Sequence, residues 1–194
     1  EDPRRRLRLR LMPAASASHG GVSVREAEWP QDAAFVGTAI STYLRQTEQE
    51  KHDVLGDPEE PEGELPERYR PEVRDPATAY ADGRVLVAEI DGAPAGVVIA
   101  LPYAGHTEVK RLWADPAVRG RGVGSALLDA VLAEAEGAVR LSVWEWRDAA
   151  IRLYTSRGFR PVDPWDDRDH LLCFESLTSL HPAAEPSEVS DSKG

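Results

Sequence analysis

Three glycines at alternate positions, Gly120, Gly122 and Gly124, are interleaved with Arg119 and Arg121 just before a helix-forming run. Glycine has no Cβ, so a ligand can approach such a backbone closely. The first amides of a helix have no internal hydrogen-bond partner and lie at the positive end of the helix dipole, while arginine adds forked donors. The stretch therefore predicts a phosphate-binding site at the start of a helix.

The type of phosphate ligand is narrowed by two comparisons. A P-loop requires a Gly-Lys-Ser/Thr sequence, and this stretch has no lysine. A dinucleotide motif places a third glycine where Ser125 stands, and it follows the first strand of its domain, whereas this stretch comes late in the chain. A nucleotide-binding α/β domain is therefore kept only as a minor alternative.

Two motifs occur in a fixed order here. RGRGVG at 119–124 matches the pattern R/Q-x-x-G-x-G/A, and AAIRLYTSRGFRPV at 149–162 is similar to A-x-x-LY-x-x-x-GF. Together, with a predicted strand between them, they resemble the GNAT N-acetyltransferase superfamily over about 22–177 and most strongly over 106–162. The resemblance implies a single α/β (α+β) domain, with a central, mostly antiparallel mixed sheet, a splayed central strand pair and flanking helices. It also implies acetyl-CoA as co-substrate, with no metal.

The resemblance carries ligand contacts onto particular positions. Backbone amides of the splayed strand, which in the family hold the pantetheine arm and the thioester carbonyl, correspond to Leu112, Trp113 and Ala114. Many relatives have an asparagine that contacts the CoA arm where this chain has Arg147, which we expect to donate to a carbonyl or phosphate. The turn that holds the pyrophosphate corresponds to Arg119, Gly120, Arg121, Gly122, Val123, Gly124 and Ser125.

Two residues are candidates for proton transfer. Tyr154 corresponds to the tyrosine that many relatives place near the CoA sulfur as general acid, and a phenol with a pKa of about 10 can protonate a thiolate. The amine acceptor must lose a proton before it attacks, and Glu108 is the candidate base, with Glu145 or water as alternatives. Strand alternation predicts that Glu108 shares a face with Lys110 and Leu112.

The elements that must position these residues follow from hydrophobic periodicity. Strands are predicted over 22–29, 107–114, 139–146 and 170–177, and a β-hairpin over 84–103 turns at Asp91-Gly92. Helices are predicted over 31–50, after the glycine stretch, and over 148–158. Segment 53–79 contains five prolines and is expected to be a loop with at most a short helix.

Composition limits the class of protein. A chain of 194 residues with 41% hydrophobic and 29% charged residues is typical of one soluble globular domain. No apolar run approaches the roughly 18 residues of a membrane helix. The net charge of −11 argues against nucleic acid or an anionic membrane as a partner. The single cysteine, Cys173, predicts the reducing cytoplasm, and the five histidines show no metal-ligand spacing.

The acceptor site is the least specified part. Trp144 and Trp146 are expected on one strand face, where they either line an acceptor pocket or pack in the sheet. An acidic segment either is a solvated loop or attracts a cationic amine, and the cationic acceptor is our prediction. This segment contains Asp57, Glu59, Glu60, Glu62 and Glu64.

Function and organisation are therefore expected as follows. Residues 1–21 form an N-terminal extension, either disordered or added upstream of Met12, 22–177 form the acetyltransferase-like domain, and 178–194 form a disordered tail. The chain is expected to transfer acetyl from acetyl-CoA to a primary amine of a small molecule or protein, by direct attack in a ternary complex. The alternative is a catalytically silent acyl-CoA-binding regulatory module. Homodimerisation is left open.

Overall fold

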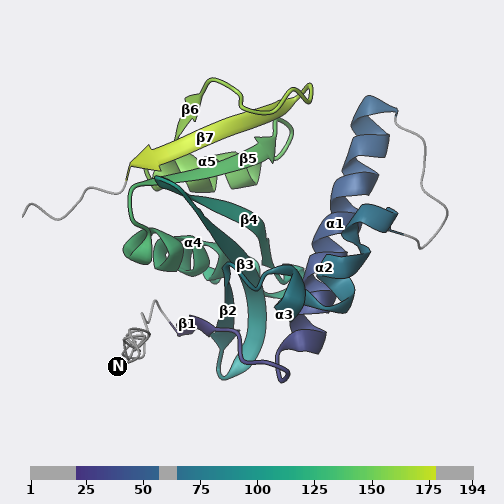
Figure 1. The fold of residues 1–194 in the computed structure, drawn as a ribbon, viewed down its shortest axis with the longest axis vertical. Helices are drawn as coiled ribbons and strands as arrows, with labels where there is room; N and C mark the ends of the chain where they lie inside the picture. The colour runs from purple at the N-terminus through teal and green to yellow at the C-terminus, as the bar shows by residue number, and fades with distance from the viewer. Residues whose placement is uncertain (1–20, 57–64, 178–194) are drawn as a thin grey trace, which may run out of the picture.

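The computed structural model describes residues 21–56 and 65–177, whose seven strands form one sheet in the order β1-β2-β3-β4-β5-β7-β6 (Figure 1). The pair β4–β5 is parallel and the other neighbouring pairs are antiparallel. The strands are β1 Val22–Glu26, β2 Arg84–Ile90, β3 Ala93–Tyr103, β4 His106–Ala114, β5 Ala138–Trp144, β6 Arg160–Val162 and β7 Leu171–Leu177. The predicted mixed, mostly antiparallel sheet is confirmed.

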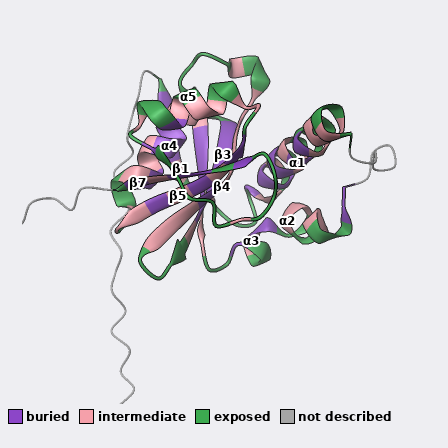
Figure 2. Ribbon diagram, turned by 90° about the horizontal axis from the view of Figure 1, so that it is seen from above, coloured by how far each residue is buried: buried purple, intermediate pink, exposed green. Residues whose placement is uncertain are grey.

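Helices cover both faces of this sheet. Figure 2 shows α4 and α5 over one face, with α1, α2 and α3 on the other. The helices are α1 Ala33–Leu55, α2 Arg70–Arg74, α3 Pro76–Ala79, α4 Val123–Glu134 and α5 Asp148–Ser156, with short 3₁₀ turns at Glu67–Tyr69 and Pro116–Val118. The predictions for 1–20, 57–64 and 178–194 lie outside the described residues.

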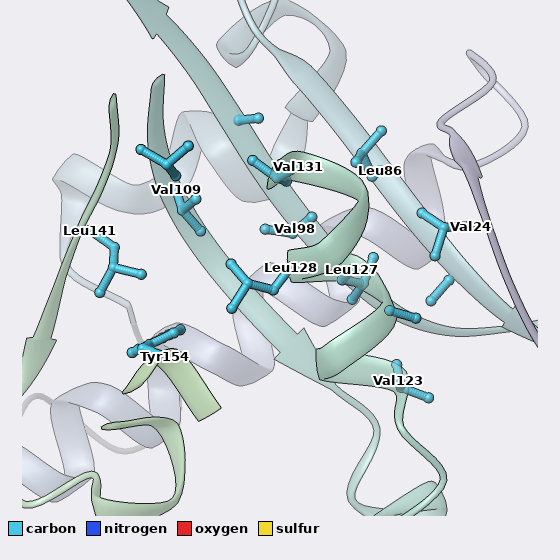
Figure 3. Packing of buried hydrophobic residues seen from close by; sticks show 14 of the residues in the cluster. Val24, Leu86, Val98, Val109, Val123, Leu127, Leu128, Val131, Leu141 and Tyr154 are labelled. Carbon is cyan, nitrogen blue, oxygen red and sulfur yellow. The ribbon is translucent and has the colours of Figure 1, made fainter. Parts of the chain in front are cut away.

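Each face has its own apolar core. Beneath α4, Leu127, Leu128 and Val131 pack on sheet residues that include Val98 and Leu86 (Figure 3). On the opposite face α1 contributes a buried stripe at helical spacing, which packs on strands β2 and β3. That stripe consists of Val36, Ala39, Ile40 and Leu44. The sheet is thus fixed from both sides, and its middle strands keep a defined position.

The segment after the first helix departs from the prediction. Helix α1 continues to Leu55, beyond the expected 31–50, and Gly56 ends it with a φ of 69°. Residues 67–79 form one 3₁₀ turn and two short α-helices where at most a short helix was expected. The prolines did not prevent this, because Pro71 and Pro76 occupy first-turn positions, where a helix needs no amide donor.

Strand β5 is shorter than predicted. It ends at Trp144, so Glu145 and Trp146 lie in the turn that leads to α5 and not on a strand face. The short edge strand β6 had no signal in the sequence, because its three residues are all exposed and include Pro161. The hairpin at Asp91-Gly92 is confirmed, and both turn residues have positive φ, at 52° and 78°.

Strands β4 and β5 separate along their length. Their paired residues run only from His106–Ala138 to Glu108–Arg140, and no pair follows toward the ends of the strands at Ala114 and Trp144. On its other side β4 stays paired with β3 as far as Ala114, with a bulge after Lys110. The splayed central pair is therefore present, and its opening lies next to the start of α4.

Candidate functional site

The glycine turn leads into α4 without a capping side chain. Gly122 is the N-cap, with a φ of 82°, and no described side chain bonds to the first amides of the helix. Gly120 also has a positive φ, of 78°. A Cβ built on either glycine would meet no atom within 4 Å, so the space beside both backbones is open. An uncapped helix start with bare, accessible backbone fits an anionic group.

The two predicted arginines flank this helix start at the surface. Arg121 lies 3.6 Å from Asp91, but the two side chains are 50% and 85% exposed, so the pair is weak and an anion can replace it. Arg119 is exposed as well. Val123, in contrast, is 2% exposed and packs in the core, which leaves only its amide for a ligand.

The backbone of β4 separates the three predicted amides into two groups. Asp115 donates its amide to the carbonyl of Ala95 in β3, at 2.9 Å. Because successive amides of a strand point to opposite sides, the Trp113 amide also faces β3, while those of Leu112 and Ala114 face the opening toward β5. Leu112 and Ala114 are therefore the amides that a group entering between β4 and β5 would meet.

The opening between the strands continues into a cavity of about 700 Å³. Leu112 from β4, Leu141 and Ser142 from β5 and Tyr154 from α5 line its wall, so both sides of the splay reach it. A second cavity of about 240 Å³ shares Tyr43, Arg111 and Ser142 with the first. The two cavities therefore adjoin each other at these residues.

Tyr154 is a buried phenol on the wall of this cavity. The residue is 7% exposed, and none of the described residues hydrogen-bonds to its hydroxyl. Burial raises the pKa of the Tyr154 hydroxyl well above its ordinary value of 10.0, and the nearby Tyr43 raises it further, although Arg147 acts in the opposite direction. The phenol is therefore protonated at neutral pH and free to donate.

Glu108 lies on the wall of the same cavity, on the face of the sheet that α1 covers. Its carboxylate is 3.4 Å from the Lys110 ammonium, and its side chain is 20% exposed. The predicted common face with Leu112 is wrong, because the bulge after Lys110 shifts the alternation and Leu112 packs toward the α4 core. Glu108 and Tyr154 line one cavity nonetheless.

Glu145, the alternative base, lies elsewhere. Its carboxylate bonds to His170 at 2.7 Å, its side chain is 49% exposed, and it lines neither cavity. The two tryptophans also differ in position. Trp144 lines the smaller cavity. Trp146 stacks on the Trp144 ring, with ring centroids 5.0 Å apart, and donates its Nε1 hydrogen to Glu50.

Arg147 caps α5 and bonds to α1. Its Nε lies 2.6 Å from the Glu50 carboxylate, its Nη2 donates to Thr47 at 2.8 Å, and its guanidinium is 5.0 Å from the centre of the Tyr43 ring. These contacts connect the helix that carries Tyr154 with the long helix of the opposite face. A contact of Arg147 with CoA stays a prediction.

The cavity wall is rich in charge, and the charges are balanced. Five cationic side chains line the larger cavity, and each has a carboxylate within 4 Å. The pairs are Arg68 with Glu48, Lys110 with Glu108, Arg111 with Glu72, Arg140 with Glu175, and Arg168 with Asp166. The described part of the wall therefore favours neither sign of acceptor charge. The prediction for the acidic segment 57–64 lies outside the described residues.

Sequence reasoning missed Arg111 and Glu72. The Arg111 guanidinium donates from Nε and Nη2 to the Glu72 carboxylate, at 2.8 and 2.9 Å. The two residues are 39 positions apart, and Glu72 stands in the segment expected to be a loop. No local pattern could have indicated this pair, because only the packing of α2 on the sheet brings it together.

Two features are absent from the described residues. In 21–56 and 65–177, no three His, Cys, Asp or Glu side chains are grouped to hold a metal ion. None of the helices in those ranges is both long and apolar enough to cross a membrane.

The central sheet opens between two parallel strands, next to a glycine turn and a buried tyrosine, which is the arrangement that the acetyltransferase resemblance implies. Residues 41–159 match the model of the acetyltransferase (GNAT) family, so the chain belongs to that family.

Individual proteins resemble this chain either over a short segment or at low sequence identity. A mycothiol acetyltransferase of Clavibacter michiganensis is 48% identical over 64 residues, which span 33% of this chain and only 20% of that protein. Among solved structures, a GNAT-family acetyltransferase of Staphylococcus aureus has a TM-score of 0.58 at 12% identity, covering 81% of this chain and 99% of its own. The structure of yncA from Salmonella typhimurium with its cofactor acetyl-CoA has a TM-score of 0.58 at 18% identity, covering 86% and 99%. At such identities these structures indicate the fold alone.

Proposed function

We propose that the protein transfers the acetyl group of acetyl-CoA to a primary amine of a small molecule or protein, by direct attack in a ternary complex. The observation that carries this proposal is the opening between β4 and β5, whose two strands both line the cavity that Tyr154 also lines. The uncapped start of α4 follows β4 in the chain. Membership of the acetyltransferase family supports the reaction type. The partial relative named mycothiol acetyltransferase supports it as well.

The donor-binding part rests on the backbone. The amides of Val123, Gly124 and Ser125 would bind the pyrophosphate, with Arg119 and Arg121 beside them and Gly120 and Gly122 leaving the approach open. The amides of Leu112 and Ala114 would hold the pantetheine arm and the thioester carbonyl. When bound, acetyl-CoA supplies an activated acetyl group. The residues present fit this ligand, because the site offers amides and cationic side chains without a group that would fill it.

Two side chains would move protons at opposite ends of the reaction. An alkyl ammonium with a pKa near 10.4 must lose a proton before its nitrogen can attack. Glu108 would take that proton, directly or through water, because its carboxylate lies on the cavity wall. Tyr154 would donate its phenolic proton to the departing sulfur, and its raised pKa keeps that proton available. The nitrogen would lose its second proton as the amide forms, which would restore the proton of Tyr154.

The acceptor is proposed to be cationic. Because each described cation of the cavity wall has a carboxylate partner, the carboxylates of the 57–64 segment would add net negative charge. Opposite charge would raise the local concentration of an ammonium acceptor. We propose a cytoplasmic location, and the single cysteine, the buried Cys173, is consistent with that reducing compartment.

Acetyl-CoA with a panel of amines tests the proposal. The panel should contain polyamines, amino sugars, aminoglycosides and peptides with free N-termini, with CoA release and acetylated product both measured. Turnover on one acceptor is expected. Acetyl-CoA binding without turnover on any of them would favour the silent regulatory module. Binding of ATP or a dinucleotide in place of acetyl-CoA would instead favour the nucleotide-binding alternative.

A further inference from the structure

Arg111 has a backbone conformation that is unusual for its position. Its φ is +53°, and it belongs to strand β4, whereas the two other described non-glycine residues with positive φ, Asp91 and His170, lie in turns. An L-residue with a side chain is disfavoured in this region, because its Cβ approaches the backbone. Such a conformation persists only where the surroundings hold it.

This conformation produces the bulge of β4. Lys110 pairs with Ile99 and Trp113 pairs with Val97, so two residues of β4, Arg111 and Leu112, stand opposite the single residue Val98. In an uninterrupted strand the alternation from Lys110 would direct the Leu112 amide into the ladder with β3. The extra residue reverses this, and the Leu112 amide faces the opening between β4 and β5 instead.

A carboxylate from the other side of the sheet holds the Arg111 side chain. Glu72 of α2 accepts Nε and Nη2 of Arg111 at 2.8 and 2.9 Å, and the two side chains are 20% and 19% exposed. The rings of Tyr43 and Tyr69 flank the guanidinium, with centroids 5.8 and 5.4 Å away. A planar, bidentate pair between aromatic rings fixes both the position and the orientation of the arginine.

Glu72 is fixed in turn by Tyr80, whose hydroxyl donates to its carboxylate at 2.5 Å. Burial opposes the negative charge of Glu72, but the bonds from Arg111 and Tyr80 outweigh it and lower the pKa of this carboxyl below its ordinary value. The carboxylate is therefore charged at neutral pH, and α2, the following residues and β4 form one connected network.

We infer that Glu72 is a positioning residue: through the bidentate pair with Arg111 it holds the bulge of β4 that directs the Leu112 amide into the opening. The inference rests on the proposed function, in which this opening binds acetyl-CoA. It assigns α2, a helix on the face of the sheet that α1 covers, a role in preparing the opening between β4 and β5. Neither residue needs to touch a substrate for this role.

Replacing Arg111 by glycine and by alanine separates the backbone effect from the loss of charge. Both changes remove the guanidinium, but only glycine adopts a φ of +53° without cost. If the pair holds the bulge, the alanine variant adopts the bulged conformation of β4 less often than the glycine variant, because alanine disfavours a positive φ. Arg111→Ala should therefore bind acetyl-CoA about tenfold more weakly than Arg111→Gly. Isothermal calorimetry with acetyl-CoA gives the two Kd values, at a temperature where circular dichroism finds both variants folded.

Glu72→Gln completes the test as a cycle. In the wild-type background Glu72→Gln should weaken acetyl-CoA binding several-fold. In the Arg111→Gly background it should leave the Kd unchanged, because a glycine at position 111 adopts the positive φ without an ion pair to hold it. Equal Kd values for Arg111→Gly and Arg111→Ala would overturn the inference, as would a Glu72→Gln variant that binds like the wild type. If the wild-type protein itself does not bind acetyl-CoA, the proposed function fails, which is a different outcome.

Discussion

The ring of Phe159 packs against the ring of Tyr154, with centroids 5.9 Å apart and planes tilted by 58°. Phe159 is 1% exposed, so it anchors the tyrosine ring in the core next to α5. The position of the ring therefore depends on packing, while the hydroxyl is left for the cavity. A change that removes only the hydroxyl tests chemistry without disturbing this contact.

Tyr154→Phe should lower kcat by about 10²–10⁴-fold, the usual contribution of a positioned general acid. The Kd for acetyl-CoA and the Tm should change little, because the ring contact remains. Tyr103→Phe is the matched control, since Tyr103 lines the same cavity but is 50% exposed. An unchanged kcat in Tyr154→Phe would remove Tyr154 from the mechanism and leave water as the proton donor.

The pH profile of the wild type should have no descending limb below pH 10 that belongs to Tyr154. Burial raises the pKa of this hydroxyl above 10.0, so the acid stays protonated while the amine acceptor loses its proton as pH rises. The measurement is kcat/KM from pH 6 to 10 for wild type and Tyr154→Phe. A descending limb below pH 10 that vanishes in the phenylalanine variant would contradict the raised pKa.

Gly122→Glu should weaken acetyl-CoA binding by about a hundredfold or more, because a carboxylate would take the place of phosphate oxygens at the helix start. Its positive φ makes any side chain there strained, so a control with the same strain is needed. Gly105→Glu supplies it, since Gly105 has a φ of 83° and open space but lies in the β3–β4 turn. Calorimetry that finds equal Kd values for the two variants would rule out the phosphate site.

Glu108→Gln should lower kcat/KM about 10²–10⁴-fold if this carboxylate removes the proton of the amine. Glu145→Gln, which alters an exposed carboxylate outside both cavities, should leave the rate unchanged. Steady-state kinetics with saturating acetyl-CoA and a varied amine give both values. If the rate falls in the Glu145 variant and not in the Glu108 variant, the base has been assigned to the wrong residue.

The pair of Glu72 and Arg111 should make stability sensitive to acid. Because the pKa of Glu72 in the folded protein lies below its ordinary 4.5, the contribution of its charge is fully present above pH 4.5 and is lost as pH falls through the lowered value. Unfolding by urea from pH 3 to 7 measures this dependence. Wild type should lose more stability than Glu72→Gln between pH 5 and 3, and parallel curves for the two proteins would show that the pair has no such effect.

The sequence by itself determined the local elements around the glycine turn and Tyr154. The glycines at 120, 122 and 124, the signature around Tyr154 and the alternation of the hairpin strands are local patterns, and neighbouring residues are enough to specify a turn, a helix start or a strand. The order of these patterns along the chain indicates a sheet with helices packed on it, and the resemblance that the two motifs carry implies the splayed strand pair.

Tertiary structure decided the rest. The bulge at Arg111 moves Leu112 to the opposite face, and a one-residue shift of register carries no signature in the strand itself. The bonds of Glu72 to Arg111 and of Glu50 to Arg147 join residues 39 and 97 positions apart. Such pairs form only after α1 and α2 pack across the sheet, because burial, not local sequence, selects which carboxylate meets which arginine.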